Sequence, residues 1–213
     1  MCLNNKNRLY IYKKTKHMKK LFSLIVLLSF TIKAQDVTIG EQTWTSKNLD
    51  VSNYRNGEAI MLAQTDSEWK AAGEKGKPAY CYYQKKGSNY GKLYNWYAVI
   101  DSRGLAPKGY HIPTDDEWTK LKDYLGEAGT KMKSNSGWQN NGNGSNSSGF
   151  AGLPGGHRLD GGFVDVGTYG YWWSSTRNFT KSAWGFYLTY FSGDFYNFNN
   201  DKRDGKSVRC LRD

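Results

Sequence analysis

The clearest pattern of apolar and polar positions lies in residues 106–125, where an extended segment leads into an amphipathic helix. Pro113 restricts the residue before it to extended conformations, which marks where the extended segment ends. Thr114 is followed three residues later by Glu117, the spacing of a capping box at a helix N-terminus. The apolar stripe that follows consists of Trp118, Leu121 and Leu125, with Lys122 along its edge. The pattern therefore predicts a helix with one buried face.

Most other periodic stretches alternate apolar and polar residues, as short β-strands do. Residues 37–44 alternate on either side of a glycine and predict a hairpin. Residues 171–176 predict a buried strand, and residues 184–199 predict a hairpin that turns at 192–194. A second capping box, Thr65-Asp66-Ser67-Glu68, predicts another helix of one to two turns.

Aromatic residues are dense in residues 77–100, with Tyr80 and Tyr82 on one face of a predicted strand. Such a row can stack on sugars, but packing in a core is the commoner explanation and the one we favour. Residues 133–149 are low in complexity and predict a long loop. Residues 150–163 combine several glycines with a proline, so we expect irregular backbone there.

The first 35 residues have the features of a targeting segment. Residues 18–35 begin with a basic group, continue with an apolar run of about a dozen residues, and end near a small residue that suits cleavage. The run is shorter than the roughly 20 residues that a membrane span requires. We therefore predict a signal peptide, with an uncleaved anchor as the alternative and the only expected link to a membrane. The domain is expected to be secreted, periplasmic or at the cell surface.

Two boundaries follow from this interpretation. Residues 1–17 precede a natural start of a signal peptide, so translation is expected to begin at Met18 and the extension to be non-native. Residues 36–213 form the predicted mature domain, which is long enough for one sizeable core.

Removing the predicted signal peptide changes the charge of the chain. The formal net charge is +11, but the first 35 residues hold eight Lys and Arg and no acid. The remainder carries 22 basic and 19 acidic residues, a net charge of +3. Nucleic acid is therefore not expected as a partner, because its binding proteins present a clustered basic face.

Two cysteines remain in the mature part, Cys81 and Cys210. In an exported chain such a pair favours a disulfide over a metal site or a nucleophile. Neither has a second cysteine or a histidine at the spacing of metal ligands, so no metal site is expected. We therefore predict a disulfide between Cys81 and Cys210.

Eight short motifs occur in an order that resembles a known family. They are IGEQTW, NLD, AYCYY, YGKLYNWYAV, LAPKGYHIPTDDEW, SGFAGLPGG, YWWSST and GKSVRCLRD. The set resembles the Fibrobacter succinogenes major paralogous domain, found in exported proteins of Bacteroidetes, over nearly all of residues 36–213. The departures are Tyr110, where the family usually has tryptophan, and His157, where an aromatic residue often follows the double glycine.

The resemblance implies an α+β fold similar to C-type lectins and to formylglycine-generating enzymes. Such a fold has small antiparallel sheets, one or two short helices, long irregular loops, and N- and C-terminal strands that pair. The resemblance implies no defined activity, cofactor or catalytic residue. The closely spaced copper-binding cysteines of the formylglycine-generating enzymes are absent here, and so are the calcium-binding triplets of true C-type lectins.

Acidic and histidine residues were considered as catalytic groups. Asp115, Asp116 and Glu117 fit the acidic first turn that a helix dipole favours, which needs no catalytic role. His111 fits a structural histidine held by hydrogen bonds. His157, Arg158 and Asp160 lie in the glycine-rich stretch, where binding residues often gather, but their spacing defines no reaction class.

We therefore expect a non-catalytic binding module that contacts a glycan or a surface protein through its loops. Loops rich in Asn, Ser, Gly and Trp make adaptable contacts. The alternatives are an enzyme with an unrecognised site at His157, Arg158 and Asp160, and a structural component of a surface assembly. The candidate ligand-binding residues are Trp138, Asn140, Asn141, His157, Arg158, Asp160, Tyr196 and Phe198.

Overall fold

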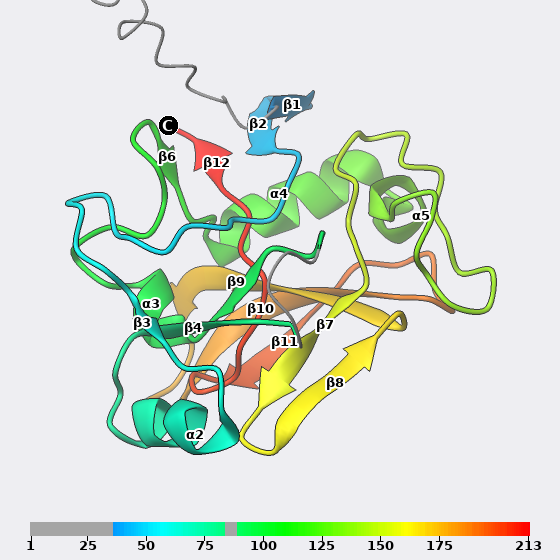
Figure 1. The fold of residues 1–213 in the computed structure, drawn as a ribbon. Coiled ribbons are helices and arrows are strands. Elements are labelled where there is room, and N and C mark those ends of the chain that lie inside the picture. The colour runs from blue at the N-terminus through cyan, green and yellow to red at the C-terminus, as the bar shows by residue number, and fades with distance from the viewer. Residues whose placement is uncertain (1–35, 84–88) are drawn as a thin grey trace, which may run out of the picture. The chain divides into compact units, whose positions relative to one another are not determined.

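The structure is a computed structural model that describes residues 36–83 and 89–213. The predicted extension at 1–17 and signal peptide at 18–35 lie outside the described residues. Within the described ranges, no helix has the length and apolar character needed to cross a bilayer. The fold is α+β, with three small sheets and short helices (Figure 1).

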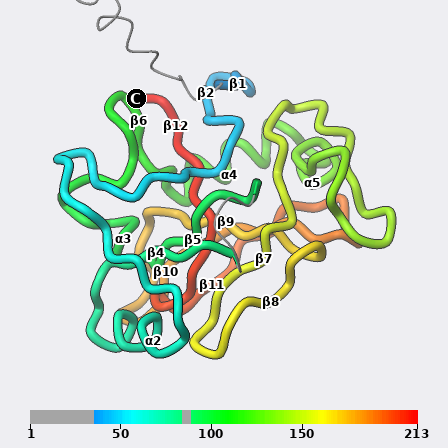
Figure 2. Tube along the Cα trace, viewed as in Figure 1, coloured from blue at the N-terminus to red at the C-terminus, as the bar shows by residue number. Residues whose placement is uncertain are grey.

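The first sheet joins the two ends of the described domain. Its strand order is β1-β2-β12-β6, and Trp44 in β2 pairs with Leu211 in β12. Figure 2 shows the N-terminal hairpin in blue beside the C-terminal segment in red. The strands are β1 Asp36–Ile39, β2 Gln42–Thr45, β6 Tyr110–His111 and β12 Leu211–Arg212. The predicted N-terminal hairpin is confirmed, as is the pairing of the terminal strands.

Helix α4 (Asp115–Leu125) is the predicted capped helix. The Thr114 hydroxyl accepts a hydrogen bond from the Glu117 backbone N–H, and the Glu117 carboxylate accepts one from the Thr114 N–H. Trp118 is fully buried, and its ring stacks on Phe186 at a centroid distance of 5.5 Å. The short helix α5 (Ala128–Met132) follows and was not predicted.

The largest sheet lies against α4, with strand order β11-β10-β9-β7-β8 (Figure 1). The predicted buried strand and C-terminal hairpin are confirmed by β9, β10 and β11. The expectation of irregular backbone at 150–163 was wrong, because β7 and β8 form a hairpin there and β7 pairs in parallel with β9. The strands are β7 Gly155–Leu159, β8 Gly162–Val166, β9 Tyr169–Arg177, β10 Ser182–Thr189 and β11 Tyr196–Asp201.

The third sheet has the order β3-β4-β5, with β3 and β4 parallel, so the sheets are not all antiparallel as expected. The capping box at Thr65 starts α2, and Asn95 caps the short helix α3. The described residues contain four helices rather than one or two. The bounds are β3 Met61–Leu62, α2 Asp66–Glu74, β4 Ala79–Tyr82, β5 Lys92–Tyr94 and α3 Trp96–Val99. Tyr80, Tyr94 and Trp96 are core residues, as the aromatic stretch predicted.

The predicted disulfide is absent, because Cys81 and Cys210 are both free and buried. Cys81 packs with Trp69 and Leu93, whereas Cys210 packs with Tyr80 and Tyr94 in a separate cluster. Alternation along β4 and β5 places these two clusters on opposite faces of the third sheet, so the thiols cannot meet. Burial raises the pKa of each thiol to about 12, which keeps both protonated.

Part of the basic charge of the sequence lies inside the fold. Arg209 is fully buried, and its guanidinium donates to the carbonyl oxygens of Thr45 and Ala151 and to the side-chain oxygen of Asn48. Hydrogen bonds of this kind offset the cost of burying a charge. The buried cations are Lys92, Lys133, Arg158, Lys202, Lys206 and Arg209. These six cations are therefore not displayed at the surface.

Candidate functional site

The face of the largest sheet that points away from α4 carries a group of aromatic side chains. Alternation along β9 and β10 sends Trp172, Phe186 and Leu188 into the core against α4. Their neighbours in the strands therefore project from the opposite side. We call this group the aromatic face: Tyr169, Tyr171, Tyr187, Tyr196 and Phe198. Tyr171 is 9% exposed, and the other four are partly exposed.

Tyr187 is the centre of the aromatic face. Its ring centroid lies 5.0 Å from that of Tyr196, 4.9 Å from that of Phe198 and 5.8 Å from that of Tyr171. Tyr169 and Tyr171 are nearly parallel, with an interplanar angle of 9° and a centroid distance of 5.6 Å. Parallel rings at this centroid distance are displaced sideways from each other and so form an offset stack. The surface therefore includes ring edges as well as ring faces.

A shallow hollow of about 310 Å³ opens in the aromatic face. Four rings line it, together with one charged residue, Asp165 of β8. The Tyr171 hydroxyl donates a hydrogen bond of 3.1 Å to Oδ2 of Asp165. Oδ1 of Asp165 has no hydrogen-bond partner within residues 36–83 and 89–213. The hollow thus combines apolar walls with one free carboxylate oxygen. The four rings are those of Tyr169, Tyr171, Tyr187 and Phe198.

The position of Asp165 depends on an irregularity in the β7–β8 hairpin. Gly155 pairs with Val166 and His157 pairs with Val164, whereas Gly156 and Asp165, which lie between them in the same register, are not paired with each other. Gly156 has φ +61°, and a Cβ there would lie 2.2 Å from the carbonyl oxygen of Val164, so only glycine fits. Asp165 has φ +66°, which is uncommon for residues other than glycine but tolerated by aspartate.

His157 packs beside the hollow, with its ring centroid 4.5 Å from that of Tyr171 and the two rings inclined by 73°. Its Nδ1 lies 3.5 Å from Oδ2 of Asp165 but makes no hydrogen bond in the described part of the chain. Burial and the nearby ammonium of Lys206 lower the pKa of His157 to about 3. His157 is therefore neutral near pH 7 and contributes no charge to the site.

Lys206 supports the aromatic face from inside. It is 1% exposed, and its Nζ lies 3.0 Å from Oδ2 of Asp204. The same Nζ is 5.4 Å from the ring centroid of Tyr171 and 5.7 Å from that of Phe198, within the range of cation–π interactions. An ion pair thus lies behind the rings, with the Lys206 side chain buried and that of Asp204 18% exposed.

Two of the predicted ligand-binding residues are buried, and their polar groups are engaged within the fold. Trp138 is 4% exposed, and its indole N–H donates to the carbonyl oxygen of Gly152. Arg158 is 0% exposed, and its Nη2 donates to Oδ1 of Asp66 at 2.8 Å. Sequence patterns missed this because both residues lie in stretches with loop-like composition, while their partners come from other elements.

The other predicted residues lie in three places. His157, Tyr196 and Phe198 belong to the aromatic face or its border. Asn140 and Asn141 form an exposed turn, next to Gln139, whose backbone N–H donates to the carbonyl oxygen of Gly167 just before β9. Asp160 accepts a hydrogen bond from Arg203, outside the hollow. The residues missed by the sequence analysis are Asp165, Tyr169, Tyr171 and Tyr187. The alternation of tyrosines in β9 was the signal available for two of them.

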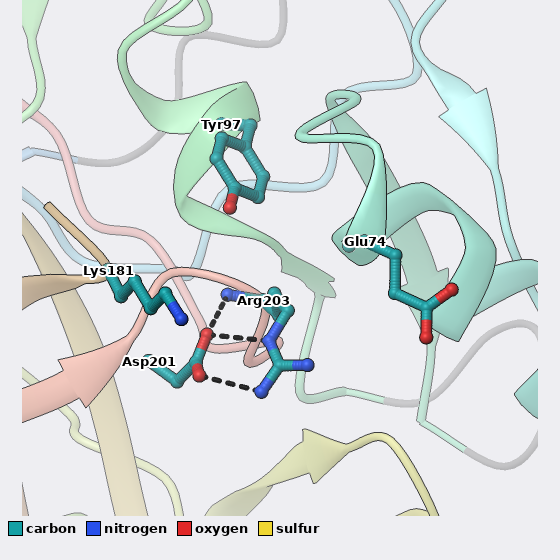
Figure 3. Close-up of a pocket in the computed structure, with 6 residues that line it drawn as sticks. Glu74, Tyr97, Lys181, Asp201 and Arg203 are labelled. Atoms are coloured by element: carbon teal, nitrogen blue, oxygen red, sulfur yellow. Dashed lines mark hydrogen bonds and ion pairs between the residues drawn. The ribbon is translucent and has the colours of Figure 1, made fainter.

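A second hollow, of about 290 Å³, lies between α2, α3 and the turn after β11 (Figure 3). Arg203 donates from Nε to Oδ1 of Asp201 and from Nη2 to Oδ2, a bidentate ion pair that Figure 3 shows within the hollow. Gly73, Glu74, Tyr97 and Lys181 complete the lining. Asp201 and Arg203 satisfy each other within this hollow.

Metal ligation was examined over the described residues. No group of three or more His, Cys, Asp or Glu side chains in residues 36–83 and 89–213 is arranged to hold an ion. His111 is held between Glu117 and Asp213, with ring nitrogens 2.9 Å and 2.8 Å from the carboxylate oxygens. Both contacts stabilise the chain ends, as expected for a structural histidine.

Comparison with known proteins gives one match. No curated protein and no solved structure matches the chain significantly. The sequence profile of the Fibrobacter succinogenes major domain matches residues 37–212, which cover nearly the whole described domain. The chain therefore belongs to the Fibrobacter succinogenes major domain family.

Proposed function

We propose that this chain is a non-catalytic binding module that recognises carbohydrate through its aromatic face. The observation that carries the proposal is the hollow formed by four aromatic rings and the free carboxylate oxygen of Asp165. Sugars present apolar C–H patches and hydroxyl groups on one small surface. Aromatic rings contact the C–H patches, and phenol and carboxylate oxygens form hydrogen bonds with the sugar hydroxyl groups.

The tyrosines suit this role energetically. A tyrosine ring loses little conformational freedom on binding, because only two side-chain torsions are fixed. Contacts among Tyr171, Tyr187 and Phe198 hold the rings before a ligand arrives. Preorganisation of this kind lowers the entropic cost of association.

We further propose that the fold is a variant of the C-type lectin fold and that the domain is exported. The pairing of β2 with β12 supports the first proposal, since terminal strands that meet are a feature of such folds. The basic and apolar pattern of residues 18–35 supports the second. An exported binding module would meet glycans at the cell surface or beyond it.

A catalytic centre at His157, Arg158 and Asp160 has little geometric support. His157 faces Tyr171, whereas Arg158 is buried against Asp66 and Asp160 is bound to Arg203. The three side chains are therefore engaged with different partners. A general base must reach the proton that it removes, and this arrangement offers no common point for a substrate.

The test is binding to a panel of soluble polysaccharides, with isothermal titration of those that bind. Tyr187→Ala removes the central ring and is expected to weaken binding at least 10-fold, about 1.4 kcal/mol. Phe179→Ala is the matched control, because Phe179 is 65% exposed in the turn between β9 and β10 and lies outside the aromatic face.

Equal affinities for the Tyr187→Ala and Phe179→Ala variants would show that the aromatic face is not the binding surface. Binding only to proteins, with no polysaccharide bound, would replace the proposed ligand class. Turnover of a bound polysaccharide would overturn the non-catalytic assignment.

A further inference from the structure

The hollow in the aromatic face has the composition of a site for a positively charged organic group. We infer that it binds an organic ammonium group, so that a preferred carbohydrate ligand carries amino groups. This inference rests on the proposed function for its sugar component. The ammonium site itself is argued from the rings, the local charge and the backbone of Asp165.

The rings surround the hollow in several orientations. Phe198 is nearly perpendicular to Tyr187, at 88°, and Tyr171 is inclined to them by 52° and 38° respectively. Rings inclined in this way form walls on different sides of a small group. An ammonium or alkylammonium group near ring faces gains cation–π attraction, and this gain increases when water is excluded.

The same rings already contact one ammonium group. Nζ of Lys206 lies within 6 Å of the centroids of Tyr171 and Phe198 from the buried side. Its charge is balanced by Asp204, at 3.0 Å. Within the described residues, neither Lys206 nor any other Lys or Arg forms an ion pair with Asp165.

Among residues 36–83 and 89–213, Asp165 is the only charged residue that lines the open side of the hollow. One of its oxygens is free to accept a hydrogen bond from a ligand, as described above. His157, which borders the hollow, is neutral near pH 7 and does not compensate this carboxylate. The open side consequently carries a net negative charge beside aromatic rings, which favours a cation over a neutral group.

The backbone of Asp165 adopts a conformation that is uncommon for residues other than glycine. A residue other than glycine at φ +66° stores conformational strain, which is found most often at binding sites. Asparagine adopts the same region readily and has nearly the same shape. Asp165→Asn therefore removes the charge without disturbing the hairpin.

Asp160→Asn is a matched control. Asp160 lies in the same β7–β8 hairpin, but it contacts Arg203 outside the hollow. The two variants make the same chemical change and alter the net charge equally. A difference between them therefore reports on the position of the carboxylate.

The experiment is isothermal titration of the full chain, at low salt and mildly acidic pH, with glucosamine oligomers and N-acetylglucosamine oligomers of equal length. The first carry amines and the second do not. We expect the amine form to bind at least 10-fold more tightly. Asp165→Asn should abolish this preference, and Asp160→Asn should retain it. Choline and a lysine amide are titrated in parallel, to separate amino sugars from other sources of an ammonium group.

Each outcome bears on a different claim. Equal affinity for the two oligomers, or a preference that survives in Asp165→Asn, would overturn the ammonium site. If the Tyr187→Ala variant still bound the oligomers more weakly than the wild type, the proposed carbohydrate function would stand. Binding of choline or the lysine amide alone, with sensitivity to Asp165→Asn, would support the ammonium site and refute the carbohydrate ligand. Failure of all four probes to bind would contradict the ammonium site.

Discussion

The two faces of the largest sheet use aromatic residues in different ways. The face against α4 carries Trp172, Phe186 and Leu188, which are at most 1% exposed and have no hydroxyl group. The opposite face carries four tyrosines and Phe198, most of them partly exposed. Tyrosine combines a ring that packs with a hydroxyl group that tolerates water. One face therefore belongs to the core, whereas the other presents rings and hydroxyl groups toward solvent.

The opposite face is itself divided. Trp173 lies on the same side of β9 as Tyr171, yet it is fully buried. The C-terminal segment covers it, since the Trp173 backbone N–H donates to the carbonyl oxygen of Ser207 and its indole N–H donates to that of Tyr94. The aromatic face is therefore the part of this side that the chain end leaves open.

The largest expected effect comes from the covered face. Trp118→Ala would remove the indole that packs on Phe186, Phe195 and Phe150, leaving a cavity at the centre of the core. We expect the free energy of unfolding to fall by about 3–5 kcal/mol. Urea unfolding followed by tryptophan fluorescence measures this loss. A loss below about 1 kcal/mol would show that α4 does not anchor the sheet.

His157 offers a test by pH at the edge of the open face. Its pKa is lowered in the folded state, so the unfolded chain binds a proton first and stability falls as pH falls below about 6.5. The loss between pH 7 and pH 5 is expected to be about 2 kcal/mol, and it continues toward pH 3. Urea unfolding of the wild type and of His157→Gln at both pH values measures it. A wild type that loses no more stability than His157→Gln would contradict the burial of this ring.

His111 should behave in the opposite way. Its carboxylate partners, Glu117 and Asp213, outweigh burial and raise its pKa. Its contribution is therefore present below the unfolded pKa and is lost as pH rises through the folded pKa. Because the side chain is 37% exposed, we expect less than about 1 kcal/mol. His111→Gln, compared with the wild type at both pH values, isolates this contribution. If His111→Gln reduced the free energy of unfolding more at pH 7 than at pH 5, the raised pKa of His111 would be contradicted.

Tyr187→Ala should affect stability much less than Trp118→Ala. Tyr187 is partly exposed, and its neighbours on the open face retain their other contacts. We expect a loss of about 1 kcal/mol in the free energy of unfolding. Denaturant unfolding of the two variants side by side provides the comparison. A loss equal to that of Trp118→Ala would mean that the open face is part of the core.

The smallest effect concerns the cysteines. Because Cys81 and Cys210 are free, a reducing agent should leave the melting temperature unchanged. Alkylation of the unfolded, unreduced protein, followed by peptide mass analysis, should label both residues. If both cysteines were labelled only after reduction, the protein would contain the disulfide that the sequence predicts.

Local signals in the sequence determined much of the fold. The capping boxes at Thr114 and Thr65, and the alternation in residues 37–44 and 184–199, each act over a few neighbouring residues. Such signals can be recognised without knowing what the element packs against. The ordered motifs likewise identified the family over residues 37–212.

The tertiary structure alone decided the site. Asp165 contacts Tyr171 because β7 pairs with β9 and thereby brings the β7–β8 hairpin beside the tyrosines. Arg158 is buried because Asp66 and Trp69, far away in the sequence, meet its guanidinium. The two thiols lie on opposite sides of the third sheet. No local pattern shows on which side of that sheet each thiol packs. Each of these outcomes depends on contacts between segments that are distant in the sequence. A pattern that spans only a few residues carries no information about the free energies of those contacts.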